Sequence, residues 1–137
     1  MGIILDSSVL IALERKGKSS KYALQELHER FDGEEIALSI ISVVELAHGI
    51  ARADSEVRRA KRQEYLDDLT ATLDIHLVTI PVALRAGQID GENTAKGIRL
   101  ALADLLIGVT ALELGYRVAT SNTRHFQMIP ALETISV

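Results

Sequence analysis

Ile98-Arg-Leu-Ala-Leu-Ala-Asp104-Leu-Leu-Ile-Gly-Val-Thr-Ala-Leu-Glu-Leu114 is the most apolar stretch of this chain, and it carries one aspartate among aliphatic side chains. No Lys or Arg lies on the helical face of Asp104, so a charged carboxylate there is costly unless it is protonated, paired or bound to a cation. We expect Asp104 to lie in the middle of a buried helix, where it has no cap to make, and to be functional. Its neighbours at helical spacing are apolar and partly small: Leu100, Ala101, Ile107, Gly108 and Ala111.

Two more acids lie in apolar surroundings. Asp6 follows the run Ile3-Ile4-Leu5, and Glu45 lies within Ile40-Ile41-Ser-Val-Val-Glu-Leu-Ala47. Each has a structural interpretation that is favoured when it is taken singly: Asp6 as an N-cap or turn residue, and Glu45 as part of a capping box with Ser42. Together with Asp104, however, three acids at costly positions indicate one shared site.

The totals indicate a folded globular protein. At 137 residues we expect a single domain over residues 1–137, and a composition of 47% hydrophobic and 25% charged residues is that of a packed chain. The absence of cysteine excludes a disulfide framework and a thiolate metal site, and it fits a cytoplasmic protein. Asp6 interrupts the apolar N-terminal stretch, and no uncharged apolar run reaches about 18 residues, so we expect neither a signal peptide nor a membrane span.

Strand and helix patterns alternate along the chain. The expected strands are Gly2–Leu5, Glu35–Ser39, Ile75–Ile80, Tyr116–Thr120 and Glu133–Ser136. The first expected helix begins at Ser7 or Ser8, and the second runs through His28. The third and fourth cover about Ser42–Arg52 and Glu56–Leu73. The fifth begins at Pro81, and the last ends at Gly115. Gly91 and Gly97 are expected to bracket a loop before the last helix. This alternation predicts an α/β fold with a parallel sheet covered on both faces.

Three carboxylates without cysteine or clustered histidine predict a hard oxygen site, suited to Mg²⁺ or Mn²⁺ rather than Zn²⁺. Such ions activate an attacking water and neutralise charge on a phosphodiester. Competing motifs fail. Gly17-Lys18-Ser19 lacks the rest of a P-loop, Glu45-x-x-His48 is one di-iron motif where two are needed, and no GxSxG nucleophile elbow is present.

Four segments resemble, in order and spacing, the PIN-domain ribonucleases, and most closely the VapC-type toxins of bacterial toxin–antitoxin pairs. The segments are Leu5-Asp6-Ser-Ser-Val-Leu-Ile11, Ser42-Val-Val-Glu45-Leu-Ala-His-Gly49, Ala103-Asp104-Leu-Leu-Ile107 and Ala119-Thr-Ser-Asn122-Thr-Arg-His-Phe126. The resemblance covers essentially the whole chain. It implies a three-layer α/β/α sandwich with a five-stranded parallel sheet, endonucleolytic cleavage of RNA that depends on Mg²⁺ or Mn²⁺, and metal-ligand roles for Asp6, Glu45 and Asp104.

The last segment departs from the pattern of that family. Many relatives carry a fourth acid just before the final Phe, where this chain has His125. A neutral imidazole adds no negative charge, so we expect a second metal to be bound more weakly. Ser7, Thr120 and Asn122 are candidates for positioning a water or the substrate, while for Thr120 and Asn122 an ordinary polar loop remains the alternative.

The hypothesis is therefore a metal-dependent endoribonuclease toxin acting on RNA, with tRNA or ribosomal RNA suggested by the family. The implied partners are a cognate antitoxin, which we expect to insert an Arg into the acidic pocket, and a second copy of the chain in a homodimer. One alternative is a noncatalytic binding module of the same fold. A receiver-like phosphoacceptor domain is disfavoured because Asp6 lacks an adjacent acid and Arg117 is the only basic residue on the late strands.

The charge distribution leaves one surface open to two interpretations. The net charge of −4 argues mildly against nonspecific nucleic-acid binding, although clustered acids can mask a local basic surface. The chain carries a basic run that is either a phosphate-contacting rim or a solvated helix face: Arg52, Arg58, Arg59, Lys61 and Arg62.

Overall fold

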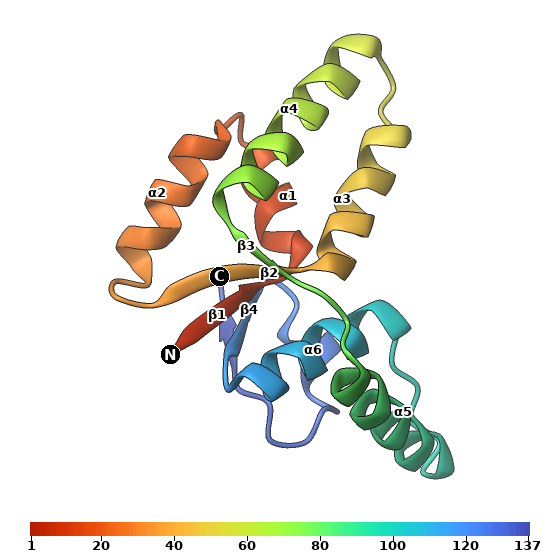
Figure 1. Ribbon diagram of the computed structural model, residues 1–137. Coiled ribbons are helices and arrows are strands. Elements are labelled where there is room, and N and C mark those ends of the chain that lie inside the picture. Colours follow the sequence, from red (N-terminus) through yellow and green to blue (C-terminus); the bar gives the residue numbers. More distant parts are fainter.

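Five parallel strands form one sheet in the order β3-β2-β1-β4-β5 in the computed structural model, which describes residues 1–137 (Figure 1). The strands are β1 (Gly2–Leu5), β2 (Glu35–Ser39), β3 (Asp74–His76), β4 (Arg117–Thr120) and β5 (Thr134–Ser136). Leu5 at the end of β1 lies beside Leu38 of β2 and Ala119 of β4. Because β1 has a neighbour on each side and helices on both faces, its sequence is uninterruptedly apolar.

Helices cover both faces of this sheet and divide the core in two. They are α1 (Ser7–Arg15), α2 (Ser20–Arg30), α3 (Ile40–Ala51), α4 (Glu56–Thr72), α5 (Ile80–Ala95) and α6 (Leu102–Leu114), with a short 3-10 helix, η1 (Thr123–Phe126). Helices α1 to α4 pack around Ile3 and Leu5, whereas α5, α6 and η1 pack around Ile4. Figure 1 shows the two groups on opposite sides of the strands. The predicted α/β/α sandwich is confirmed.

The start and the interior of α5 differ from the prediction. β3 ends at His76 rather than Ile80, because Thr79 caps α5 by accepting a hydrogen bond from an amide of its first turn (3.3 Å), and Pro81 lies in that turn. Gly91 lies inside the helix and not in a loop, since burial of one helical face outweighs the poor helix propensity of glycine. The side chains buried on that face are Val82, Ala86, Ile89 and Asn93.

The topology brings several chain segments to one edge of the sheet. Asp6 follows the carboxyl end of β1, α3 follows that of β2, and Thr120 is the last residue of β4. Helix α6 leads into β4 through a tight turn at Gly115, which adopts a left-handed conformation (φ 70°), so the first turn of α6 lies back at this edge. This is where ligands bind in open α/β sheets. No helix is long and apolar enough to cross a membrane.

Candidate active site

Asp6 is buried at the edge of the sheet, with only 5% of its surface exposed. It occupies the N-cap position of α1, as the capping interpretation expected, but its side chain makes no capping hydrogen bond. Its Oδ2 atom instead accepts hydrogen bonds from the hydroxyls of Ser8 (2.7 Å) and Thr120 (2.8 Å). The carboxylate is therefore held by one hydroxyl from α1 and one from the end of β4, and its other oxygen, Oδ1, accepts no hydrogen bond from the chain.

Glu45 projects from α3, and its carboxylate is held by α1. The hydroxyl of Ser7 donates to its Oε1 atom at 3.0 Å. The capping-box interpretation is wrong, because α3 begins at Ile40 and is capped by Ser39, whose hydroxyl accepts the Ile41 amide at 3.1 Å. Ser42 is buried in the first turn of α3, so Glu45 has no helix end to cap and is free to face Asp6.

Asp104 lies in the first turn of α6 and not in mid-helix, because the helix begins only at Leu102. An acid in a first turn is favoured by the helix dipole. Asp104 therefore has a local structural role that was not expected from the sequence. The Asp104 side chain is nonetheless only 17% exposed, and its Oδ2 lies 3.4 Å from Nδ1 of His125. His125, at the position where the family pattern leads us to expect a fourth acid, is 55% exposed and makes this contact with Asp104.

The three acids influence one another electrostatically, which indicates a shared site. Burial raises the pKa of Glu45 above its ordinary value, and the charges of Asp6 and Asp104 raise it further against the hydrogen bond from Ser7. Burial likewise raises the pKa of Asp104, Asp6 adds to this rise, and His125 opposes it. Without a cation, the site disfavours carrying all its negative charges at once.

The unpaired oxygens of the three acids fit a hydrated cation. Asp6 and Glu45 each accept hydrogen bonds on one oxygen alone, and Asp104 contacts His125 through one oxygen alone. None of the remaining oxygens is a buried atom without a partner, so they face space that solvent reaches. No three acidic or histidine side chains converge closely enough to enclose a bare ion. Mg²⁺ keeps several waters in proteins and uses one or two carboxylates, so these acids would hold such an ion partly through its waters.

The structure places the remaining candidates at different depths. Thr120 is fully buried and donates to Asp6, whereas Asn122 contributes its backbone amide to the Thr120 hydroxyl (2.9 Å) and makes no side-chain hydrogen bond. Ser8 was missed as a site residue, since its hydroxyl was considered only as a helix cap. Its position two residues after Asp6, with a second polar loop arriving from β4, was the available indication.

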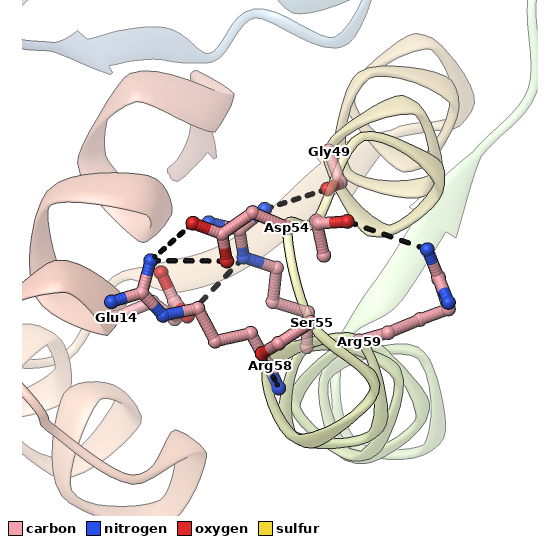
Figure 2. Close-up of polar contacts among 8 residues, drawn as sticks. Glu14, Gly49, Asp54, Ser55, Arg58 and Arg59 are labelled. Atoms are coloured by element: carbon pink, nitrogen blue, oxygen red, sulfur yellow. Dashed lines mark hydrogen bonds and ion pairs between the residues drawn. The ribbon is translucent and has the colours of Figure 1, made fainter.

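Three arginines of the basic run have partners within the chain (Figure 2), and one of them, Arg59, pairs with Glu56 and donates to the Ala53 carbonyl. Arg58 forms a bidentate pair with Asp54 at 3.0 and 3.2 Å. Arg62 donates to the Gly49 carbonyl at 2.7 Å and lies 3.7 Å from Glu14, and so connects α4 to α3 and α1. The run therefore mainly fastens the α3–α4 hairpin, and it supplies little free positive charge for a phosphate-contacting rim.

Comparison with known proteins gives matches over nearly the whole chain. Residues 3–131 match the PIN domain family model. Ribonuclease VapC of Rickettsia bellii is 31% identical over 137 residues, which are 100% of this chain and 97% of that protein. Ribonuclease VapC1 of Rickettsia felis is 29% identical over 137 residues, again 100% of this chain and 97% of that protein. The crystal structure of VapBC2 from Rickettsia felis, bound to a DNA fragment from their promoter, is similar with a TM-score of 0.83 at 25% identity, covering 100% of this chain and 99% of that chain.

Proposed function

The chain belongs to the PIN domain family, and from that premise we propose that it is an endoribonuclease dependent on Mg²⁺ or Mn²⁺ and the toxin of a type II toxin–antitoxin pair. The observation that carries the chemistry is the arrangement of three acids from three elements, each with one oxygen left unpaired. The relatives named Ribonuclease VapC support RNA as the substrate, and tRNA or ribosomal RNA is the class we propose.

Asp6, Glu45 and Asp104 are the proposed metal ligands and catalytic residues. When bound, the ion supplies activation of the attacking water and neutralises charge on the phosphodiester. The chain contributes orientation: Ser7 holds one oxygen of Glu45, and Thr120 holds one oxygen of Asp6, so that each carboxylate keeps its other oxygen free for the ion. Because His125 brings no carboxylate, the site has the charge for one strongly bound ion. The side chain of Asn122 is exposed, and its proposed role is to position the RNA or a water.

The test is cleavage of RNA by the purified protein with Mn²⁺ and after its removal with EDTA. We expect cleavage only with the metal, and we expect Asp104→Asn to abolish it because one ligand charge is lost. The matched control is Asp90→Asn, which removes the same charge from an exposed position on α5. Normal cleavage by Asp104→Asn would show that Asp104 is not a ligand. No cleavage by the parent at any metal concentration would favour the alternative, a noncatalytic PIN-fold binding module.

An antitoxin could bind two neighbouring features of this chain, the negative charge of the acids and an apolar pocket. A pocket of about 100 Å³ lies between α1, α3 and α4, and Leu10, Leu46 and Leu66 are among its lining residues. Glu45 also lines this pocket, so the pocket adjoins the acidic site. We propose that an antitoxin segment places an apolar side chain in this pocket and an Arg on the carboxylates, since a guanidinium binds carboxylates bidentately. The similarity to VapBC2 from Rickettsia felis supports a cognate antitoxin as the partner.

Co-expression with the neighbouring reading frame tests the antitoxin. We expect expression of this chain alone to arrest growth, and its partner to restore growth and to co-purify with it. Changing the inserted Arg of that partner to Glu should restore toxicity. Harmless expression of the chain alone, together with no RNA cleavage in Mn²⁺, would reject the toxin assignment.

Apolar side chains on α3, α5 and α6 support the proposed homodimer. Val44 is 61% exposed, Leu84 70% and Leu102 67%, on helices that pack against one another. A second copy covering these side chains would remove that surface from water. Leu84→Glu should shift the protein to monomer in sedimentation, while Val57→Glu, at an equally exposed site on α4, should not. A parent that sediments as a monomer would exclude the dimer.

A further inference from the structure

Ser8 lies where the segment that carries the buried Asp6 meets the loop that follows β4. Its hydroxyl donates to Oδ2 of Asp6 at 2.7 Å and accepts the backbone amide of Ser121 at 3.2 Å. It also lies 3.4 Å from the hydroxyl of Thr120, which donates to the same Asp6 oxygen. One side chain from α1 is thereby connected both to the acid after β1 and to the loop after β4.

The two hydroxyls act on one carboxylate oxygen and leave the other open. Ser8 and Thr120 both donate to Oδ2 of Asp6, so this atom is held by two charge-assisted hydrogen bonds. A carboxylate fixed at one oxygen has lost rotation about its terminal bond, and Oδ1 therefore keeps one direction. Removing one donor leaves this oxygen with a single hydrogen bond, so the carboxylate is held less firmly even though its charge is unchanged.

From this geometry we infer that Ser8 is a positioning residue of the metal site, which holds Asp6 so that Oδ1 faces the ion. The inference rests on the proposed function for the identity of the ion. Ser8 touches neither the ion nor the RNA, and it acts through Asp6 and through the loop at Ser121. Groups that orient metal ligands in this way typically account for about 10- to 100-fold in metal affinity or activity.

The experiment compares Ser8→Ala and Ser8→Thr with the parent, using calorimetric titration of the apo protein with Mn²⁺ alone. We expect Ser8→Ala to bind Mn²⁺ about 10- to 100-fold more weakly. Ser8→Thr, which keeps the hydroxyl, should bind close to the parent. The matched control is Ser20→Ala, because the hydroxyl of Ser20 donates to Oδ2 of Asp68 at 2.8 Å, in a similar serine–aspartate pair between α2 and α4. It should lower the melting temperature without changing Mn²⁺ affinity.

RNA cleavage by the same variants separates this inference from the proposed function. In Ser8→Ala we expect kcat to fall and KM for RNA to stay unchanged, since no substrate contact is removed. Parent-like Mn²⁺ affinity in Ser8→Ala overturns the inference even if the parent cleaves RNA. A parent that binds Mn²⁺ without cleaving RNA rejects the nuclease, while weakened Mn²⁺ binding in Ser8→Ala still supports the positioning role. A parent that binds no Mn²⁺ overturns the inference, and cleavage alone then decides the function.

Discussion

The acids of this site are distinguished by the partner that holds each of them. Hydroxyl donors hold Asp6 and Glu45 at 2.7 to 3.0 Å, whereas Asp104 has only His125, at 3.4 Å. A histidine at this position contacts the acid without adding a negative charge. We therefore expect His125 to determine how many ions the site binds strongly.

The substitution His125→Asp tests that statement. An added carboxylate beside Asp104 supplies the charge that a second ion needs, so we expect one strong Mn²⁺ site in the parent and two in the variant. Calorimetric titration counts the sites, and His125→Asn controls for loss of the imidazole without added charge. Two equally strong sites in the parent would mean that Asn122 or Thr120 already completes a second site.

Asp104→Asn also predicts a change in stability, with a sign opposite to that of most substitutions in buried sites. Because burial and Asp6 raise the pKa of Asp104, its ionised form is disfavoured in the folded apo protein. A neutral amide of nearly the same shape relieves that cost. We expect the apo variant to melt at the same or a higher temperature than the parent at pH 7, measured by scanning calorimetry. A clear decrease would show that the contact with His125 stabilises the fold more than the repulsion destabilises it.

The sequence singled out the three acids, but it explained two of them by the wrong geometry. Glu45 was linked to Ser42 by a spacing that capping boxes share with ordinary first turns, and the actual cap, Ser39, lies at the end of the preceding strand. Asp104 was placed in mid-helix because the apolar run extends upstream of α6 to Ile98. Ser8 was not predicted, since its role depends on the loop at Ser121, 113 residues away.

At the scale of elements, α6 is held close to the segment that follows β4. Gly108 has no side chain, and a Cβ there would lie 2.4 Å from Cδ1 of Ile129 and 3.1 Å from Cδ2 of Leu132. The small residue in the apolar helix is therefore explained by close packing. The apolar run predicted that this helix exists but not where it begins, whereas α5 was misjudged because Gly91 suggested a loop that burial overrides.

Two glycine substitutions should consequently have opposite effects. Gly87→Ala on α5 meets nothing within 4 Å, and it should stabilise the protein by about 0.5–1 kcal/mol through reduced backbone entropy of the unfolded chain. Gly108→Ala gains the same term but crowds the buried Ile129, and overpacking costs about 1–3 kcal/mol. We expect a net loss of about 1–2 kcal/mol for Gly108→Ala in urea unfolding. Equal stabilisation by both alanines would show that Ile129 and Leu132 move aside at little cost in free energy.

At the scale of the whole molecule, the sheet brings together charges that oppose its own stability. A parallel sheet covered on both faces could be predicted because strand and helix patterns alternate, and the family resemblance implied five strands, but the strand order was not predicted. The meeting of Asp6, Glu45 and Asp104 at one edge follows from the observed order, while the distances between them do not. A site that disfavours full ionisation stabilises the apo protein less as pH rises, and it needs a cation to recover what is lost.

The pH dependence of melting provides the corresponding test. The pKa values of Glu45 and Asp104 are raised from 4.5 and 3.8, so their contribution to stability is present below those ordinary values and is lost as pH rises through the raised ones. The lowered pKa of the exposed Glu35, caused first by its hydrogen bond from Tyr116, acts in the opposite direction and lies away from the site. The difference between the parent and Asp104→Asn therefore isolates the effect of the site.

We expect this difference in melting temperature to favour Asp104→Asn increasingly as pH rises through the raised pKa values. Mn²⁺ binds the deprotonated acids, so its stabilising effect on the parent should grow over the same interval. At a hundredfold excess over Kd it should reach about 2.7 kcal/mol, or a melting shift of about 5–10 °C for a domain of this size. Asp104→Asn should show a smaller shift, and Asp90→Asn should respond as the parent does. If Mn²⁺ does not change the melting temperature of the parent at any pH, the three acids do not share an ion.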